Sequence, residues 1–464
     1  MLVVMDVPPN NADCPQCKQL LKIIEQLQEQ NKRLEQRLEK IEREGKRQAA
    51  PFRKSRKPLP KKPGRKKGDD YGKHQRRAAP QTIDETYVVP LPEACPDCGE
   101  TKLEKTETVV QYQTEIPRTV IHRQFNIDAG VCCGCGCRVQ GRHELQTSDA
   151  TGAAAAQFGP NVHAAIALAN KELGLSHGKV RRLLEMLFDL SISRSTSCRS
   201  MLRTGRRLEQ AHEEVGRSVR GSPQVVGDET GWRVDGTSAW LHAFVGLTAT
   251  YYEIDPTRSL QPAKRLLGMD WSGIFGHDGW SIYDQFTEAA HQQCFAHLFR
   301  RCDALIEQNT GGALRFPREV KSLLKQGIEF RDRFVAGEVS AHGMRIMAGR
   351  LKFQMWKLVL RPKQHAGNER LAKFLGNHLR SLFTFLRHPG ADATNWRGEQ
   401  AIRPAVVNRK VWGGNRSWSG AAAQSRIMSV MQTCKQRRAD PFRFNRNQLV
   451  NPSPLALPLP ICAR

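Results

Sequence analysis

The first regular pattern of hydrophobic positions lies near the N-terminus of the chain. It consists of Leu20, Ile24, Leu27, Leu34, Leu38 and Ile41, spaced three, four or seven residues apart, with Asn31 on the same line. Glu, Gln, Lys and Arg surround this narrow stripe, as in a coiled coil whose core Asn fixes a two-stranded register. The alternative is a single amphipathic helix packed on a domain. We predict a coiled coil over residues 14–45, and a homodimer or higher oligomer.

A second pattern predicts helices between residues 155 and 220. Apolar residues at helical spacing run from Leu173 to Phe188, and the Ser-rich segment from Ser191 to Ser195 supplies caps for another helix. Two helices around a short polar turn, with Arg194 and Arg199 on the second, predict a helix-turn-helix that contacts DNA. An ordinary helical hairpin is the alternative.

The pattern then changes to that of strands. Residues 225–236, 239–246 and 250–255 predict three adjacent strands, the first two joined by a polar turn at Asp235. This is an antiparallel start to a sheet. A helical stretch at about 263–267, a fourth strand over 273–278 and a helix from Cys294 are expected to follow.

Two carboxylates mark the ends of these strands. We place Asp228 at the end of the first strand and Asp278 at the end of the fourth. In a ribonuclease H-like sheet these ends are neighbours, so both side chains can share hard cations such as Mg²⁺. Two-metal phosphoryl transfer uses ions about 3.5 to 4 Å apart, and a third carboxylate normally completes the site. A turn-forming Asp is the alternative for each residue.

Composition bounds the class of protein. The 464 residues exceed one typical domain, and their net charge of +26 indicates a polyanionic partner. The segment from Lys46 to Arg77 contains fourteen Lys and Arg but only two Asp. The segment from Arg397 to Arg464 contains twelve Lys and Arg but only two acidic residues. A solvated face is the alternative, but two concentrated blocks favour nucleic acid. Neither a membrane span nor a secretory signal is found, so we expect no membrane partner and a cytoplasmic protein.

The first basic block lies in a segment rich in Lys, Arg, Pro and Gly. Such a composition cannot bury a core, so residues 46–80 are predicted to be a disordered linker. Its run of Arg65, Lys66 and Lys67 is a candidate for contact with DNA phosphates or a minor groove. A spacer kept soluble by its charge is the alternative.

Cysteine pairs predict a metal site within residues 81–147. Cys95 and Cys98 form one pair, and Cys132 and Cys135 form another beyond a near-alternating, β-rich stretch at 108–126. Four thiolates at this spacing are typical of a zinc ribbon. The adjacent residues Cys133 and Cys137 leave the second pair ambiguous, and a redox pair is the weaker alternative. Cys14 and Cys17 have no second cysteine pair in their own segment. Zinc binding by these two residues, shared between the two chains of a dimer, is therefore a minor hypothesis.

Longer strings resemble the insertion-sequence-66 family of DDE transposases over nearly the whole chain. They are Asp228-Glu-Thr-Gly-Trp-Arg-Val-Asp-Gly, Asp278-Gly, Gln293-Cys-Phe-Ala-His-Leu, 382–395, Glu399-Gln-Ala-Ile-Arg-Pro and Arg409-Lys-Val-Trp-Gly-Gly-Asn-Arg-Ser-Trp. The resemblance implies a catalytic triad of Asp228, Asp278 and Glu399 that binds Mg²⁺ or Mn²⁺. It implies a ribonuclease H-like domain over 221–434, with a helical insertion at about 306–380 and a divergent tail at 435–464.

The expected protein is therefore a multidomain α+β chain. It combines a coiled coil, a zinc ribbon, a helical DNA-binding region and a ribonuclease H-like α/β catalytic domain. The resemblance implies a bacterial transposase that binds element ends and target DNA in the nucleoid, alongside companion proteins of the same element. Further candidates for DNA contact lie in the C-terminal basic block, at Arg403, Arg409, Lys410 and Arg416.

Two other functions remain open. Trp396 and Gln400 stand where family members typically carry Asn and Arg, and with the unusual tail they favour a catalytically inactive, transposase-derived repressor. A zinc-ribbon transcription factor would explain the basic blocks, but not the spacing of the acids.

Overall fold

A computed structural model describes most of the chain from residue 78 onward. It covers residues 78–117, 119–146, 148–152, 157–388, 390–451 and 453–460, together with 19, 22–31 and 33–35. The chain divides into two compact units, Met1–Glu115 and Ile116–Arg464. In the described parts, no helix is long and apolar enough to cross a membrane.

The first unit contains the predicted coiled-coil segment. Residues 19, 22–31 and 33–35 are helical, and Ile24, Leu27 and Leu34 on the predicted stripe are exposed. The rest of 14–45, with Cys14 and Cys17, lies outside the described residues, as does the linker up to residue 77, which includes Arg65, Lys66 and Lys67. The coiled coil and its oligomeric state therefore stay predictions.

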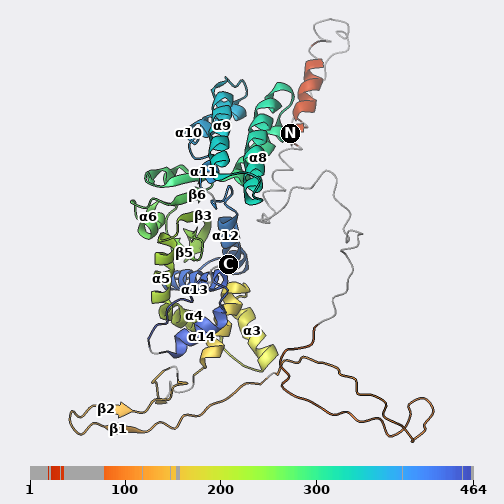
Figure 1. The fold of residues 1–464 in the computed structure, drawn as a ribbon. Coiled ribbons are helices and arrows are strands. Elements are labelled where there is room, and N and C mark those ends of the chain that lie inside the picture. The colour runs from red at the N-terminus through yellow and green to blue at the C-terminus, as the bar shows by residue number, and fades with distance from the viewer. Residues whose placement is uncertain are drawn as a thin grey trace, which may run out of the picture. The chain divides into compact units, whose positions relative to one another are not determined.

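A mixed five-stranded sheet forms the centre of the second unit (Figure 1). Its order is β5-β4-β3-β6-β7, from β3 (Gln224–Val234), β4 (Thr237–Val245), β5 (Thr250–Asp255), β6 (Ile274–His277) and β7 (Ala290–Gln293). The pairs β3–β4 and β4–β5 are antiparallel, whereas β3–β6 and β6–β7 are parallel. The predicted antiparallel start is thus confirmed. Its first turn has positive φ at Asp235 and Gly236, which suits the twist of a tight hairpin.

Helices bury both faces of the sheet. On one face, Val225, Phe244 and Phe275 pack in a core with α5 (Glu209–Arg220) and α6 (Gln261–Leu267). On the other, Leu241 and Tyr252 pack against α12 (Trp396–Trp412) and α13 (Trp418–Gln436). Side chains alternate between the faces along a strand, so Asp228 shares the α12 face with Trp232, and Glu229 takes the opposite face.

Further helices precede and follow the sheet. They are α2 (Pro160–Ala167), the π-helical η2 (Leu168–Glu172), α3 (His177–Phe188), α4 (Arg194–Arg207) and α14 (Pro441–Val450). Ser193 caps α4 as predicted, accepting a hydrogen bond from the Thr196 amide at 3.0 Å. Phe444 of α14 and Leu457 are buried in the same core as α3 and α4, so much of the C-terminal tail belongs to this unit.

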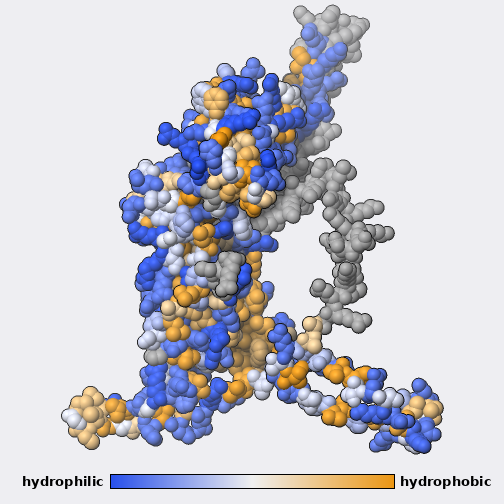
Figure 2. Space-filling model, in the orientation of Figure 1, coloured by the Kyte–Doolittle hydropathy of each residue, from blue (hydrophilic) through white to orange (hydrophobic). Residues whose placement is uncertain are grey.

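A helical insertion separates β7 from α12 and has a hydrophobic core of its own. It contains α7 (Phe295–Gln308), η4 (Gly311–Leu314), α8 (Arg315–Val335), α9 (Ala341–Leu360), α10 (Ala366–Asn377) and α11 (Thr384–Arg387). Much of the surface in Figure 2 is hydrophilic, yet Ile346, Phe353, Trp356 and Leu360 of α9 are exposed.

The prediction of a β-rich stretch at 108–126 is wrong. All of it but residue 118 is described and contains no strand, and the strands nearby are β1 (Ala129–Val131) and β2 (Arg138–Gln140). Val109, Val110 and Ile116 are exposed. Alternation produces a strand when one face can be buried, and these side chains have no such face.

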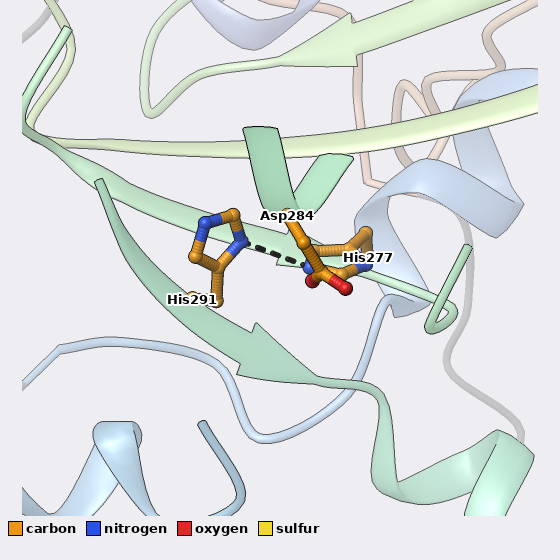
Figure 3. Close-up of side chains that lie close together, drawn as sticks. All are labelled: His277, Asp284 and His291. Carbon is orange, nitrogen blue, oxygen red and sulfur yellow. Dashed lines mark hydrogen bonds between the residues drawn. The ribbon is translucent and has the colours of Figure 1, made fainter. Parts of the chain in front are cut away.

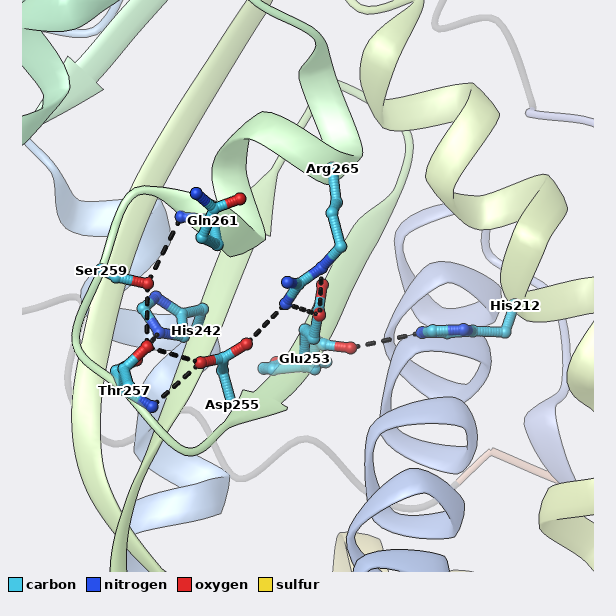
Figure 4. Close-up of polar contacts among 9 residues, drawn as sticks. His212, His242, Glu253, Asp255, Thr257, Ser259, Gln261 and Arg265 are labelled. Atoms are coloured by element: carbon cyan, nitrogen blue, oxygen red, sulfur yellow. Dashed lines mark hydrogen bonds and ion pairs between the residues drawn. The ribbon is translucent and has the colours of Figure 1, made fainter.

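A polar network ties the edge strand β5 to α6 (Figure 4). Arg265 donates from Nε to Glu253 Oε1 at 3.0 Å and from Nη2 to Asp255 Oδ2 at 2.6 Å. Thr257 donates to the other oxygen of Asp255 through its amide and its hydroxyl. The two carboxylates are largely buried, so Arg265 compensates charges that would otherwise be desolvated without a partner.

We expect Arg265→Met to lower the free energy of unfolding by about 1 to 3 kcal/mol, because both carboxylates lose their cation. Urea denaturation at neutral pH measures this loss. Arg315→Met is the matched control, since the Arg315–Glu319 pair is exposed and should contribute less than about 0.5 kcal/mol. Equal small losses in both variants would contradict a structural role for the network.

Candidate active site

Parallel pairing brings the first two predicted acids together. The register of β3 and β6 joins Gln224 to Ile274 and Val226 to Gly276, so two further steps place Asp228 opposite Asp278. Asp278 directly follows β6, as predicted. Asp228 lies within β3 and not at its end, because pairing with β4 continues to Val234 after β6 has ended. The Asp228 carboxylate therefore lies where the parallel part of the sheet stops.

A tight turn holds the second acid. Asp278 Oδ1 accepts a hydrogen bond from the Trp280 amide at 3.0 Å, and Gly279 adopts φ +95°. A Cβ on Gly279 would lie 2.6 Å from a Phe374 ring carbon, so only glycine fits this turn.

The third acid, Glu399, lies in the first turn of α12, which approaches β3 closely. A Cβ on Gly398 would lie 3.0 Å from Asp228 Cβ. Asn395, just before the helix, donates from Nδ2 to the Gly227 carbonyl and from its amide to Cys294 Sγ, both at 3.1 Å. These bonds fix the start of α12 to β3 and to the start of α7.

The two unusual residues beside Glu399 do not form this tether. Trp396 and Gln400 are exposed, and Arg397 lies over the Trp396 ring. The contacts that hold the helix come from Asn395 and Gly398. The placement of Glu399 thus does not depend on Trp396 or Gln400.

Negative charge is concentrated around Asp228. Burial, together with the charges of Glu229, Asp278 and Glu399, raises the pKa of Asp228 to about 8. The three triad acids do not form a group whose oxygens all lie within 4.8 Å, as judged over the described residues. Glu399 instead forms an ion pair with Arg300.

Glu229 is a fourth acid that the sequence analysis did not single out. Its side chain is 3% exposed, and its carboxylate accepts hydrogen bonds from Arg258 at 3.0 and 2.6 Å and from Tyr283 at 3.2 Å. Arg258 in turn lies over the rings of Trp240 and Trp280. Glu229 is therefore already paired, on the face of β3 opposite Asp228.

Two residues of α7 complete the surroundings of the acids. Arg300 Nη2 donates to Glu399 Oε1 at 2.6 Å and to His297 Nε2 at 3.1 Å. The charges of Asp278 and Glu399 reach His297, whose pKa is lowered by burial. The string from Gln293 to Leu298 contributed to the family resemblance, but the sequence assigned no role to His297 or Arg300.

A separate group of possible metal ligands consists of His277, Asp284 and His291 (Figure 3). The Gly279 amide donates to His277 Nδ1 at 3.2 Å, so Nε2 carries the ring proton and donates to His291 Nδ1 at 3.1 Å. His291 Nε2 then donates to the Phe286 carbonyl at 2.9 Å. All four ring nitrogens have partners, so we interpret this group as a chain of hydrogen bonds with a structural role.

The predicted zinc ligands lie in two turns of the same form, one in each unit. Cys95 N donates to Glu100 O at 2.8 Å, and Cys132 N donates to Cys137 O at 2.9 Å. In each turn, backbone N–H groups lower the pKa of the first thiol, at Cys95 and at Cys132. Thiolates are the form that binds zinc. Within the second turn, this likeness makes Cys132 and Cys135, and not Cys133 or Cys137, the counterparts of Cys95 and Cys98.

The predicted DNA-contact residues of the second unit are mostly at the surface. Arg194 and Arg199 are exposed on α4, and Arg403, Lys410 and Arg416 are exposed on and after α12. Arg409 is different, because it donates to Thr230 Oγ1 at 3.2 Å and to the Gly231 carbonyl. Its guanidinium therefore supports β3.

Comparison with known proteins places this arrangement among transposases. The family described as "Transposase IS66 family" matches residues 155–423, which is more than half of the chain and includes all three acids. The chain therefore belongs to the IS66 transposase family. No curated protein matches it at a significant level.

Proposed function

We propose that this protein binds the ends of a bacterial insertion sequence and catalyses metal-dependent DNA cleavage and strand transfer through Asp228, Asp278 and Glu399. The observation that carries the proposal is the convergence of these three acids within the segment that matches the family. The sheet supports a ribonuclease H-like fold, because three antiparallel strands continue into two parallel ones with β3 in the centre.

The residues present fit Mg²⁺ or Mn²⁺. Hard divalent cations take carboxylate oxygens as ligands, and Asp228 is buried with the charges of Glu229, Asp278 and Glu399 nearby, which a bound cation would offset. Bound ions would activate the attacking oxygen and stabilise the leaving oxygen. The chain's part is positional: β3 and the turn after β6 fix Asp228 and Asp278, and Asn395 fixes the helix that bears Glu399. Glu229 is already occupied by Arg258.

An assay on DNA with the sequences that flank the gene tests this function. Wild-type protein and Mg²⁺ should nick the DNA at the element end, leave a 3′ hydroxyl and join that end to target DNA. The alternative, an inactive repressor derived from a transposase, predicts binding to the same ends without cleavage in either Mg²⁺ or Mn²⁺.

Oligomerisation should follow from the predicted coiled coil. Leu27→Pro should separate the chains, because Pro removes a helix hydrogen bond and costs roughly 3 kcal/mol. Asn31→Ile should instead strengthen association but mix oligomeric states, since an apolar core position no longer disfavours trimers. Sedimentation of both variants, with gels that detect paired element ends, measures these effects. A monomeric wild type that still pairs ends would refute the coiled coil.

A further inference from the structure

Glu399, the third acid of the candidate site, forms an ion pair with Arg300 of α7. Glu399 lies at the rim of the acid group, and its Oε1 accepts a hydrogen bond from Arg300 Nη2 at 2.6 Å. The arginine is also held by its own helix, because Nε donates to the Ala296 carbonyl at 3.3 Å. The cation is thus positioned at the edge of the acids from the side of α7.

The pair is exposed to solvent and therefore exchangeable. The Arg300 side chain is 61% exposed and that of Glu399 is 41% exposed. Ion pairs in such surroundings contribute little to folding. Its two members can therefore take other partners without loss of the fold, whereas the Glu229 side chain, which pairs with Arg258, is only 3% exposed.

We propose that Arg300 is a counter-ion that holds Glu399 in the metal-free protein and binds a DNA backbone phosphate once a divalent cation has taken Glu399. This proposal rests on the proposed function. It adds a phosphate site beside the acids and a competition between Arg300 and the cation for one carboxylate.

The chemistry of the side chains supports this exchange. A cation at Asp228 and Asp278 would compete for Glu399, because the start of α12 lies against β3, where a Cβ on Gly398 would be 3.0 Å from Asp228 Cβ. Arginine's planar fork of donors matches a phosphate as well as a carboxylate. A DNA strand whose reacting phosphate lies over the acids would bring phosphate oxygens to the exposed guanidinium of Arg300.

Manganese binding to the DNA-free, full-length protein tests the first half. Electron paramagnetic resonance of Mn²⁺ should show that Arg300→Gln tightens binding about fivefold, because the competing cation is gone. Arg301→Gln is the matched control. It removes the same charge from the next residue, whose guanidinium lies over the Phe374 ring, 4.2 Å from its centroid. Combined with Glu399→Gln, the Arg300→Gln change should lose its effect on Mn²⁺.

Salt dependence of binding to an element end tests the second half. With Mn²⁺ present, the slope of log affinity against log salt should fall by about one for Arg300→Gln, as expected when one phosphate contact is lost. Without a divalent cation, the slope should equal that of the wild type, since Arg300 is then bound to Glu399.

The competition for Glu399 and the phosphate site at Arg300 can each fail while the proposed function holds. Unchanged or weaker Mn²⁺ binding in Arg300→Gln would overturn the competition, and an unchanged slope in Mn²⁺ would overturn the phosphate site. An Asp228→Asn variant that binds Mn²⁺ as tightly as wild type would overturn the triad itself. Loss of Mn²⁺ by Asp228→Asn, without any effect of Arg300→Gln, would reject this inference alone.

Discussion

Asp228→Asn should abolish strand cleavage and joining while it stabilises the metal-free protein. The amide cannot replace the carboxylate as a ligand for the cations, so we expect a loss of at least about 1,000-fold in activity. Binding to element ends should remain, because Asp228 is not a DNA-facing cation. The gain in stability follows from the buried charge that the variant removes.

The sign and pH range of this gain follow from the raised pKa. Asp228 has a pKa of about 8 in the folded protein, whereas the ordinary aspartate value, which applies to the unfolded chain, is 3.8. Below pH 4 the carboxyl is protonated in both the folded and the unfolded protein, so its ionisation does not change the free energy of unfolding. Between pH 4 and 8 the unfolded chain ionises first, so the wild type loses stability as pH rises, and the full penalty is present above pH 8. One pKa unit corresponds to about 1.4 kcal/mol, so the rise from 3.8 to about 8 corresponds to a gain of up to about 6 kcal/mol above pH 8.

Urea denaturation from pH 5.5 to 8.5, in chelator and in Mg²⁺, measures these effects. The gain of Asp228→Asn should grow with pH in chelator, and Mg²⁺ should stabilise the wild type but not the variant. Asp270→Asn is the control, since Asp270 is 79% exposed and paired with Arg220 away from the site. Retained cleavage, or a variant less stable than the wild type at pH 8.5, would argue against a metal-binding Asp228.

Loss of one zinc ligand should have the second large effect. We expect one zinc ion per full-length chain, held by Cys95, Cys98, Cys132 and Cys135. Cys132→Ser should lose it, whereas Cys133→Ser should keep it, because Cys132 and not Cys133 occupies the position that corresponds to Cys95. Binding of a structural zinc supplies about 10 kcal/mol or more of folding free energy, so loss of the ion should unfold this region.

Elemental analysis of the purified variants, with limited proteolysis of residues 81–147, measures both consequences. The pair Cys132 and Cys133 makes a close comparison, since the two differ by one position in the same turn. Zinc retained by Cys132→Ser but lost by Cys133→Ser would exchange the assignments. A wild type without zinc but with oxidised thiols would instead support the redox pair.

Local patterns predicted β3, β4, β5 and β6 but not β7, because turn residues bound the first four strands and much of each strand is buried. The antiparallel hairpins follow from alternation and from the Asp235-Gly236 turn, and Asp278 follows β6 as expected. The position of Asp228 within β3 could not be predicted, because the end of a strand depends on which neighbour continues to pair. At 108–126 the same alternation did not produce a strand. Alternation shows that a segment could have one apolar and one polar face, but not whether another part of the protein covers the apolar face.

The third acid was predictable only because a family motif marked it. Glu399 was assigned from resemblance, because no local pattern distinguishes it from any other glutamate in a first helical turn. Arg258, Tyr283 and Arg300 escaped notice, since each meets its acid across 29, 54 or 99 residues of sequence. Such contacts are set by the packing of whole elements, and one sequence does not reveal them.

The tether at Asn395 also fixes how the helical insertion is joined to the sheet. Phe295 N donates to the Ala393 carbonyl at 3.0 Å and Asn395 N donates to Cys294 Sγ, so the chain leaves and returns at one point. Lengthening a loop whose ends are already pinned adds little entropic cost. These two contacts, and not the length of the chain between them, therefore set the distance between the first and third acids of this protein.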